Sequence, residues 1–131
     1  VVDDNQELFA LFERYVAGEP YHLVHAASAE EALALVRSLR PEVITVDLMM
    51  PRRDGWELLQ ALRSGPQATS APIIVCSVLD ESQLALSLGA QACLRKPVGQ
   101  AELLQALRMA HGRAWLGAER PGSPAGSRGP D

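Results

Sequence analysis

Apolar residues in this chain alternate between short unbroken runs and longer stretches in which they recur every three or four positions. The unbroken runs at 43–46 and 73–76 consist of β-branched and other apolar or neutral residues, a pattern typical of strands that are buried on both faces. Apolar positions with helical spacing predict amphipathic helices over 5–17, 28–40, 55–64 and 99–111. Shorter apolar stretches at 1–4, 21–26 and 91–94 are consistent with three further strands.

Capping residues indicate where several of these helices begin. Ser28 and Glu31 have the spacing of a capping box, in which each side chain accepts a hydrogen bond from a free backbone amide of the first turn. Asp54 and Asp80 open the third and fourth helices in the same way. The fourth helix is predicted to be short, and to end before Gly89, which is placed to adopt the left-handed conformation that closes a helix.

Five strands therefore alternate with five helices, and the connecting loops are only a few residues long. This alternation predicts an α/β fold with a parallel sheet between two helical layers. We expect a three-layer, doubly wound, five-stranded sheet in the order 2-1-3-4-5. The domain is predicted to span residues 1–113, and residues 114–131, rich in Gly, Pro and Ser, are predicted to form a disordered tail or linker.

Composition excludes several classes of function. The chain has 131 residues, of which 47% are hydrophobic and 21% charged, and no apolar run reaches the roughly 20 residues of a membrane span. The net charge of −4 and the absence of a basic stripe argue against a nucleic-acid surface. Cys76 and Cys93 lack metal-ligand spacing and lie in apolar runs, so we expect buried, reduced thiols in a cytoplasmic protein that contacts neither nucleic acid nor membrane.

Acidic residues follow two of the predicted strands. Asp3 and Asp4 end the first strand, and Asp47 ends the third. The predicted order makes these strands neighbours, so the three carboxylates would meet at the sheet edge where open α/β folds bind ligands. Crowded carboxylates must hold a proton or bind a cation, and a set of oxygen ligands with room for water favours Mg²⁺.

Two further side chains reach the same edge. Ser77 closes the fourth strand, and Lys96 follows the fifth; Lys96 is the only lysine among 12 cationic residues. A cation, an ammonium group, a hydroxyl and a central carboxylate together indicate a receptor for a phosphoryl group. Asp47 is the best candidate for the nucleophile, which would become an aspartyl phosphate.

The motifs that carry this chemistry resemble those of the receiver domain of two-component response regulators. They are Asp-Asp-Asn at 3–5, Asp-Leu-Met-Met-Pro-Arg-Arg-Asp-Gly at 47–55, Ser77 after a buried strand, and Lys-Pro at 96–97. The resemblance covers residues 1–113 and implies the flavodoxin-like fold of chemotaxis regulators. It also implies that a sensor histidine kinase or a histidine phosphotransfer protein donates the phosphoryl group, and that a downstream protein or an attached output domain responds.

The resemblance also implies the roles of individual residues. Asp4, Asp47 and the backbone carbonyl of Met49 would bind Mg²⁺ directly, and Asp3 would do so through water. The remaining implied roles belong to the phosphoryl site: Ser77 and Lys96 would hold the phosphoryl oxygens, and the Lys96–Pro97 peptide bond would be cis.

The chain departs from the family pattern at several positions. Cys93 stands where the family usually has an aromatic residue, whose rotation accompanies the movement of the Ser or Thr hydroxyl. The segment from Ser77 to Lys96 is shorter than in single-domain chemotaxis regulators, and the loss falls in the fourth helix. Met49 and Leu79 flank the expected path of attacking water, and neither side chain can orient a water molecule.

Three functions remain open from the sequence. The first is a phosphorylatable receiver that switches partner interactions; such an acceptor promotes its own phosphotransfer and dephosphorylation but is not a turnover enzyme. The second is a receiver-like interaction module that is not phosphorylated. The third is a hydrolase with an aspartate nucleophile, although the Asp-x-Asp-x-Thr motif of that class is absent after the first strand. The cognate kinase, the output, the oligomeric state and the phosphoryl lifetime are not determined by the sequence, nor is the choice between a stand-alone regulator and a receiver of a hybrid kinase.

Overall fold

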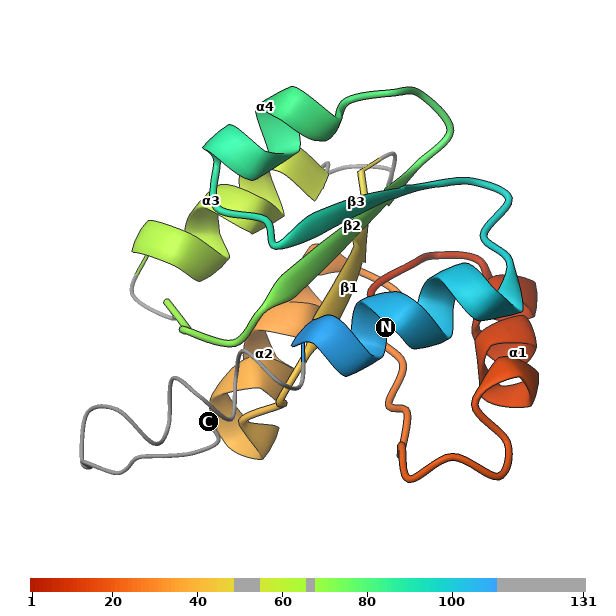
Figure 1. Cartoon of the computed structure of the whole chain (residues 1–131). Helices are drawn as coiled ribbons and strands as arrows, with labels where there is room; N and C mark the ends of the chain where they lie inside the picture. The colour runs from red at the N-terminus through yellow and green to blue at the C-terminus, as the bar shows by residue number, and fades with distance from the viewer. Residues whose placement is uncertain (49–54, 66–67, 111–131) are drawn as a thin grey trace, which may run out of the picture.

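The fold is built on three parallel strands at the centre of the molecule (Figure 1). A computed structural model of the chain describes residues 1–48, 55–65 and 68–110. The strands are β1 (Ile44–Asp47), β2 (Ile73–Ser77) and β3 (Ala92–Arg95), hydrogen-bonded in that order. Their register places Asp47 opposite Cys76, and Ser77 opposite Arg95, so the polar residues at the carboxyl ends share one edge of the sheet.

Two more segments extend this sheet beyond β1, each through a single residue. Val2 forms parallel bridges to Ala26 on one side and to Val46 on the other. The Val2 amide donates to the Thr45 carbonyl at 2.8 Å, and the Asp3 amide donates to the Ala26 carbonyl at 3.0 Å. The spatial order of the five segments is therefore the predicted 2-1-3-4-5, and the α/β fold class is confirmed.

The predicted strands at 1–4 and 21–26 are not formed as strands within the described residues. Each is reduced to the bridge at Val2 or Ala26. Val2 and Ala26 form an isolated bridge, and within the described residues no consecutive pairs extend it into a ladder. A strand requires consecutive backbone pairs, and the hydrophobic pattern of 21–26 reports burial, not the number of backbone pairs that form.

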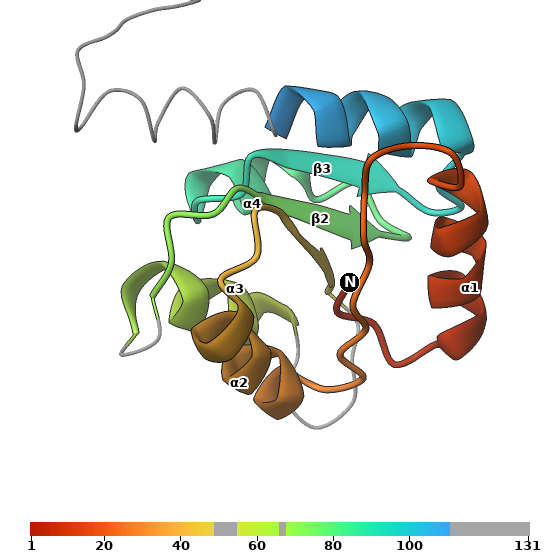
Figure 2. The ribbon, with the colours of Figure 1, turned by 90° about the horizontal axis from the view of Figure 1, so that it is seen from below.

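Helices cover both faces of the sheet, as Figures 1 and 2 show. On one face lie α1 (Gln6–Tyr15) and a helix spanning residues 100–110. On the other lie α2 (Ala29–Leu39) and α3 (Gly55–Ser64), and the short α4 (Ser82–Ser87) packs beside β3. Among the described residues, no helix is long and apolar enough to cross a membrane. The predicted boundary at residue 113 and the tail at 114–131 lie outside the described residues.

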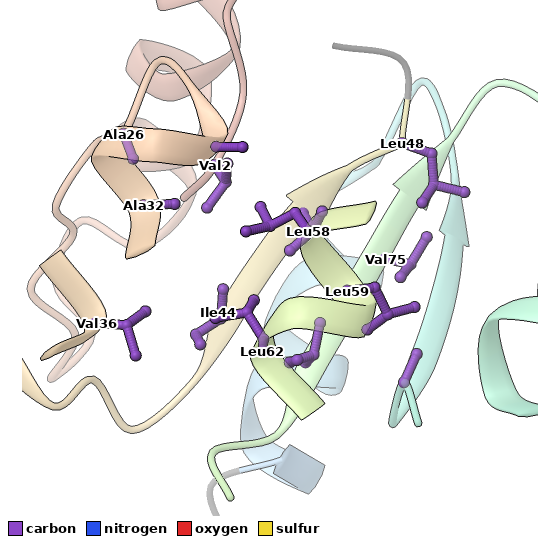
Figure 3. Packing of buried hydrophobic residues seen from close by; sticks show 14 of the residues in the cluster. Val2, Ala26, Ala32, Val36, Ile44, Leu48, Leu58, Leu59, Leu62 and Val75 are labelled. Atoms are coloured by element: carbon purple, nitrogen blue, oxygen red, sulfur yellow. The ribbon is translucent and has the colours of Figure 1, made fainter. Parts of the chain in front are cut away.

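Alternate residues of β2 are buried in opposite layers. Val75 packs with Leu59 and Leu62 of α3, which are completely buried (Figure 3). Ile74 belongs instead to the layer formed by α1 and residues 100–110, together with Phe12. Because both faces of β2 are covered, its sequence is an unbroken apolar run and does not alternate with polar residues.

The predicted helix caps are realised with small differences. The Ser28 hydroxyl accepts a hydrogen bond from the Glu31 amide at 3.1 Å, but the Glu31 carboxylate accepts from the amide of Ala27, one residue earlier than in a standard capping box. The prediction for α4 is wrong in its start: Asp80 accepts hydrogen bonds from the amide and hydroxyl of Ser82, and the helix begins at Ser82. Gly89 follows α4 with a φ of 106°, as predicted, whereas Asp54 lies outside the described residues.

Candidate functional site

The three acidic residues predicted to meet do meet at the carboxyl edge of the sheet. Asp3, Asp4 and Asp47 each offer a carboxylate oxygen, and these oxygens all lie within 4.8 Å of one another. Asp3 and Asp47 are only 1% and 5% exposed, whereas Asp4 is exposed. Hydrogen bonds of Val2 with Thr45 and Asp47 fix the two backbone segments side by side. The sheet therefore holds two buried carboxylates and one solvated carboxylate together.

Lys96 lies between the two buried carboxylates. Its Nζ atom is 3.1 Å from Asp3 Oδ2 and 3.3 Å from Asp47 Oδ1. The Lys96 amide donates to the Ser77 carbonyl at 2.8 Å, and the peptide bond to Pro97 is cis, as expected. The sequence indicated that Lys96 reaches this edge but not that it forms ion pairs with both acids.

Burial and the ion pairs shift the pKa values of this cluster in a consistent way. Burial raises the pKa of Asp3, and the hydrogen bonds from the Asn5 amide and from Lys96 only partly oppose this rise. Burial also acts to lower the pKa of Lys96, but the hydrogen bond and charge of Asp3 and the charge of Asp47 outweigh it, so the pKa of Lys96 is raised. Lys96 therefore remains a cation at neutral pH and serves as the counter-charge of the two buried acids.

Ser77 ends β2 next to this cluster and is 2% exposed. Its Oγ atom accepts a hydrogen bond from the Leu79 amide at 3.1 Å, which fixes the oxygen in a turn at the end of the strand. Within the described part of the chain, the hydroxyl proton of Ser77 has no acceptor. The hydroxyl can therefore donate to an oxygen that enters the site.

Gly55 allows α3 to begin directly against the end of β1. Its amide donates to the Leu48 carbonyl at 3.0 Å. A Cβ atom at this position would come within 2.5 Å of Leu48 Cα and would also overlap the backbone carbonyl of Asp47. The sequence predicted only that a glycine closes the loop. The structure gives the physical reason, which is a backbone contact with the residue at the centre of the site.

Of the remaining predicted residues, the structure describes Leu79, Cys76 and Cys93 but not Met49. Met49 lies outside the described residues, so its carbonyl as a metal ligand stays a prediction. Leu79 is 56% exposed beside Ser77. Cys76 is buried, and burial raises its pKa to about 12. Cys93 is only partly buried, so the prediction that both thiols are buried is wrong for this one, which lies on β3 at the edge of the sheet; both cysteines are free thiols.

Sequence reasoning missed one side chain near the acids. His25 carries no sequence signal for a role at this site, but its Nε2 atom lies 2.7 Å from the backbone carbonyl oxygen of Asp3. No local pattern marks this contact, because the two residues are 22 positions apart and belong to segments that meet only in the folded sheet.

The acidic cluster fits a hard divalent cation. Its donors are carboxylate oxygens, without sulfur or imidazole, and this donor set suits Mg²⁺. The exposure of Asp4 leaves room for the water ligands that Mg²⁺ usually keeps. Asp3, Asp4 and Asp47 are the described residues that could hold the ion.

Comparisons with known proteins agree with this geometry. A family model for the response regulator receiver domain matches residues 1–108. Response regulator MprA of Mycolicibacterium vanbaalenii is 36% identical over 111 residues, which cover 82% of this chain and 47% of the relative. The chain thus spans about half the length of the curated relatives it matches.

Solved structures show the same fold. The signal receiver domain of a protein described as a LuxO repressor, from Vibrio parahaemolyticus, superimposes with a TM-score of 0.81 at 25% identity, covering 89% of this chain and 91% of that one. Chemotaxis protein CheY4 of Vibrio cholerae gives a TM-score of 0.75 at 28% identity, covering 83% and 93%.

Proposed function

This chain belongs to the response regulator receiver family of two-component signalling, and on that premise we propose that Asp47 is its phosphoacceptor. The observation that carries the proposal is the convergence around Asp47. One buried carboxylate, one solvated carboxylate and an ammonium group surround it, and a hydroxyl ends the adjacent strand. Structural ion pairs in a core do not require a third, exposed acid, whereas a solvated carboxylate beside two buried ones can serve as a ligand for a metal ion.

In the proposed reaction, a carboxylate oxygen of Asp47 attacks the phosphorus of a phosphohistidine. A new P–O bond forms, the P–N bond breaks, and the imidazole of the donor leaves with the electron pair of that bond. Lys96, already 3.3 Å from Asp47, is placed to neutralise a phosphoryl oxygen. Ser77 has a hydroxyl proton that can be donated to another phosphoryl oxygen. The protein thus positions groups and neutralises charge, which is the main contribution of proteins to phosphoryl transfer.

Mg²⁺ belongs to this proposal as the cofactor. Asp4 and Asp47 would bind it directly, together with the backbone carbonyl of Met49, and Asp3 would act through water. When bound, the ion supplies charge neutralisation for the phosphoryl oxygens. The acid cluster supports this assignment because its oxygens lie within 4.8 Å of one another.

The partners and the location follow from the same proposal. A sensor histidine kinase or a histidine phosphotransfer protein would donate the phosphoryl group, and a downstream protein or an attached output domain would respond to it. The domain would act in the cytoplasm, as an acceptor that promotes its own phosphotransfer and dephosphorylation. We place its boundary near residue 113, followed by a tail or linker at 114–131.

Acetyl phosphate with Mg²⁺, followed by intact-protein mass, tests this function. We expect the protein to gain one phosphoryl group and the Asp47→Asn variant to gain none. Asp80→Asn is the matched control, because Asp80 is an exposed aspartate whose carboxylate accepts local hydrogen bonds from Ser82, and this variant should be modified like the parent. Absence of any gain in the parent would instead support an interaction module that is not phosphorylated. Continuous phosphate release without a stable gain would support a hydrolase.

A further inference from the structure

His25 connects α1 to the backbone of the acidic cluster. Its imidazole ring stacks on the ring of Phe9, with centroids 4.7 Å apart and ring planes inclined by 14°. Its Nε2 atom lies 2.7 Å from the backbone carbonyl oxygen of Asp3. The side chain thus has one face against a helix and one nitrogen against the acidic segment.

The hydrogen bond from His25 has a defined direction. A carbonyl oxygen can only accept, so Nε2 must carry a hydrogen and donate it. The carbonyl in question belongs to the peptide unit that joins Asp3 to Asp4. This unit is planar and rigid, so a donor held in place by Phe9 restrains the orientation of the whole plane between the two acids.

Asp4 depends on this restraint more than Asp3 does. The carboxylate of Asp3 accepts hydrogen bonds from the Asn5 amide at 2.9 Å and from Lys96 at 3.1 Å. Within the residues that the structure describes, the carboxylate of Asp4 makes no hydrogen bond or ion pair. The place of Asp4 in the cluster is therefore set by its backbone, and the peptide plane immediately before it is held by His25.

We propose that His25 is a positioning residue for the metal site, acting through the Asp3–Asp4 peptide to aim the carboxylate of Asp4 at the cation shared with Asp47. This inference rests on the proposed function, because Mg²⁺ is the cation of that site. Groups that orient metal ligands from outside the coordination sphere typically contribute a factor of about 10 to 100 in metal affinity. Because His25 acts on one of several ligands, we expect the lower end, a loss of about 10-fold.

Two substitutions separate the hydrogen bond from the packing. His25→Phe retains a ring that can stack on Phe9 but removes the donor. His25→Gln removes the stacking but places an amide N–H the same number of bonds from Cβ as Nε2. His22→Phe is the matched control, because His22 is an exposed histidine on the same segment.

The test is a Mg²⁺ titration of the full chain, monitored by amide chemical shifts, which also report whether each variant is folded. Urea unfolding in EDTA measures the stability of the same variants. We expect His25→Phe to bind Mg²⁺ about 10-fold more weakly than the parent, and His25→Gln and His22→Phe to bind within about threefold of it. In urea unfolding we expect the opposite ranking, with His25→Phe more stable than His25→Gln, because Phe keeps the ring contact with Phe9 and Gln does not. His25→Leu, which also lacks a donor, replaces His25→Phe if that variant does not fold.

The outcomes separate this inference from the proposed function. If the parent binds Mg²⁺ and gains a phosphoryl group but the donor-free variants bind Mg²⁺ equally well, the role of His25 is refuted and the function stands. The role is also refuted if the more stable of the His25→Phe and His25→Gln variants is the one that binds Mg²⁺ more tightly. If the parent binds no Mg²⁺, the proposed function fails, and the positioning role fails with it.

Discussion

Replacing Lys96 by Met tests whether this ammonium group is the counter-charge of the two buried acids. Met has an unbranched stem of similar length, so the change removes the cation with little loss of volume. At an effective dielectric of about 20, contacts of 3.1 Å and 3.3 Å each correspond to a gross attraction of about 5 kcal/mol. Most of this attraction is offset by the cost of removing the charged groups from water. Removing one partner of a buried pair costs about 3–5 kcal/mol, and Lys96 is 20% exposed, so we expect the lower end, about 3 kcal/mol near pH 8.

The loss of stability should depend on pH in a definite direction. The pKa of Asp3 in the folded protein is already raised above the usual 3.8 by burial, and Lys96 acts to lower it. In the variant, the pKa of Asp3 therefore rises further. A carboxyl group with a raised pKa stabilises the fold below its unfolded pKa, and this contribution is lost as the pH rises through the folded pKa. The destabilisation by Lys96→Met should be largest near pH 8 and should shrink as the pH falls toward 4.

Urea unfolding of parent and variant in EDTA, near pH 8 and near pH 5, measures this difference. Other carboxyl groups titrate in both proteins, so their contributions largely cancel in the comparison. Arg95→Met is the matched control, because Arg95 is the adjacent cation and is exposed. Mg²⁺ should restore much of the stability of the Lys96 variant, since the ion supplies positive charge to the same acids. An equal loss at both pH values, or no loss at all, would refute the counter-charge role.

Three shorter predictions concern the same site. Asp47→Asn should raise the free energy of unfolding in EDTA by about 1 kcal/mol, because the repulsions from Asp3 and Asp4 that it removes outweigh the attraction to Lys96; a lower melting temperature would contradict this. Gly55→Ala should lower the free energy of unfolding in urea by about 2–3 kcal/mol, because the added Cβ would overlap the backbone of 47–48. Gly99→Ala is the control and should change stability little, because its Cβ would lie 3.4 Å from a carboxylate oxygen of the Glu102 side chain. Iodoacetamide near pH 8 should leave Cys76 unmodified in the folded protein, because burial raises its pKa to about 12; peptide mapping that finds Cys76 modified as fast as Cys93 would refute this.

The sequence alone determined the alternation of strands and helices and the position of the acids along the chain. The apolar runs that form β1 and β2 are typical of strands buried on both faces, and apolar residues at helical spacing are typical of amphipathic helices. Both patterns are local properties of the sequence. A parallel sheet then brings the carboxyl ends of its strands together, so the meeting of Asp3, Asp4 and Asp47 followed from strand order. The family motifs gave the same residues and also the cis bond before Pro97.

Only the tertiary structure decided how these groups are held. Lys96 pairs with Asp3 across 93 positions, and His25 holds the Asp3 carbonyl across 22. The expected strand at 21–26 is reduced to one bridge, between Ala26 and Val2. Sequence patterns report the burial of a residue and the conformation of its near neighbours. Which side chains from distant segments lie within hydrogen-bonding distance depends on how the layers pack, and that packing sets the charge balance around Asp47.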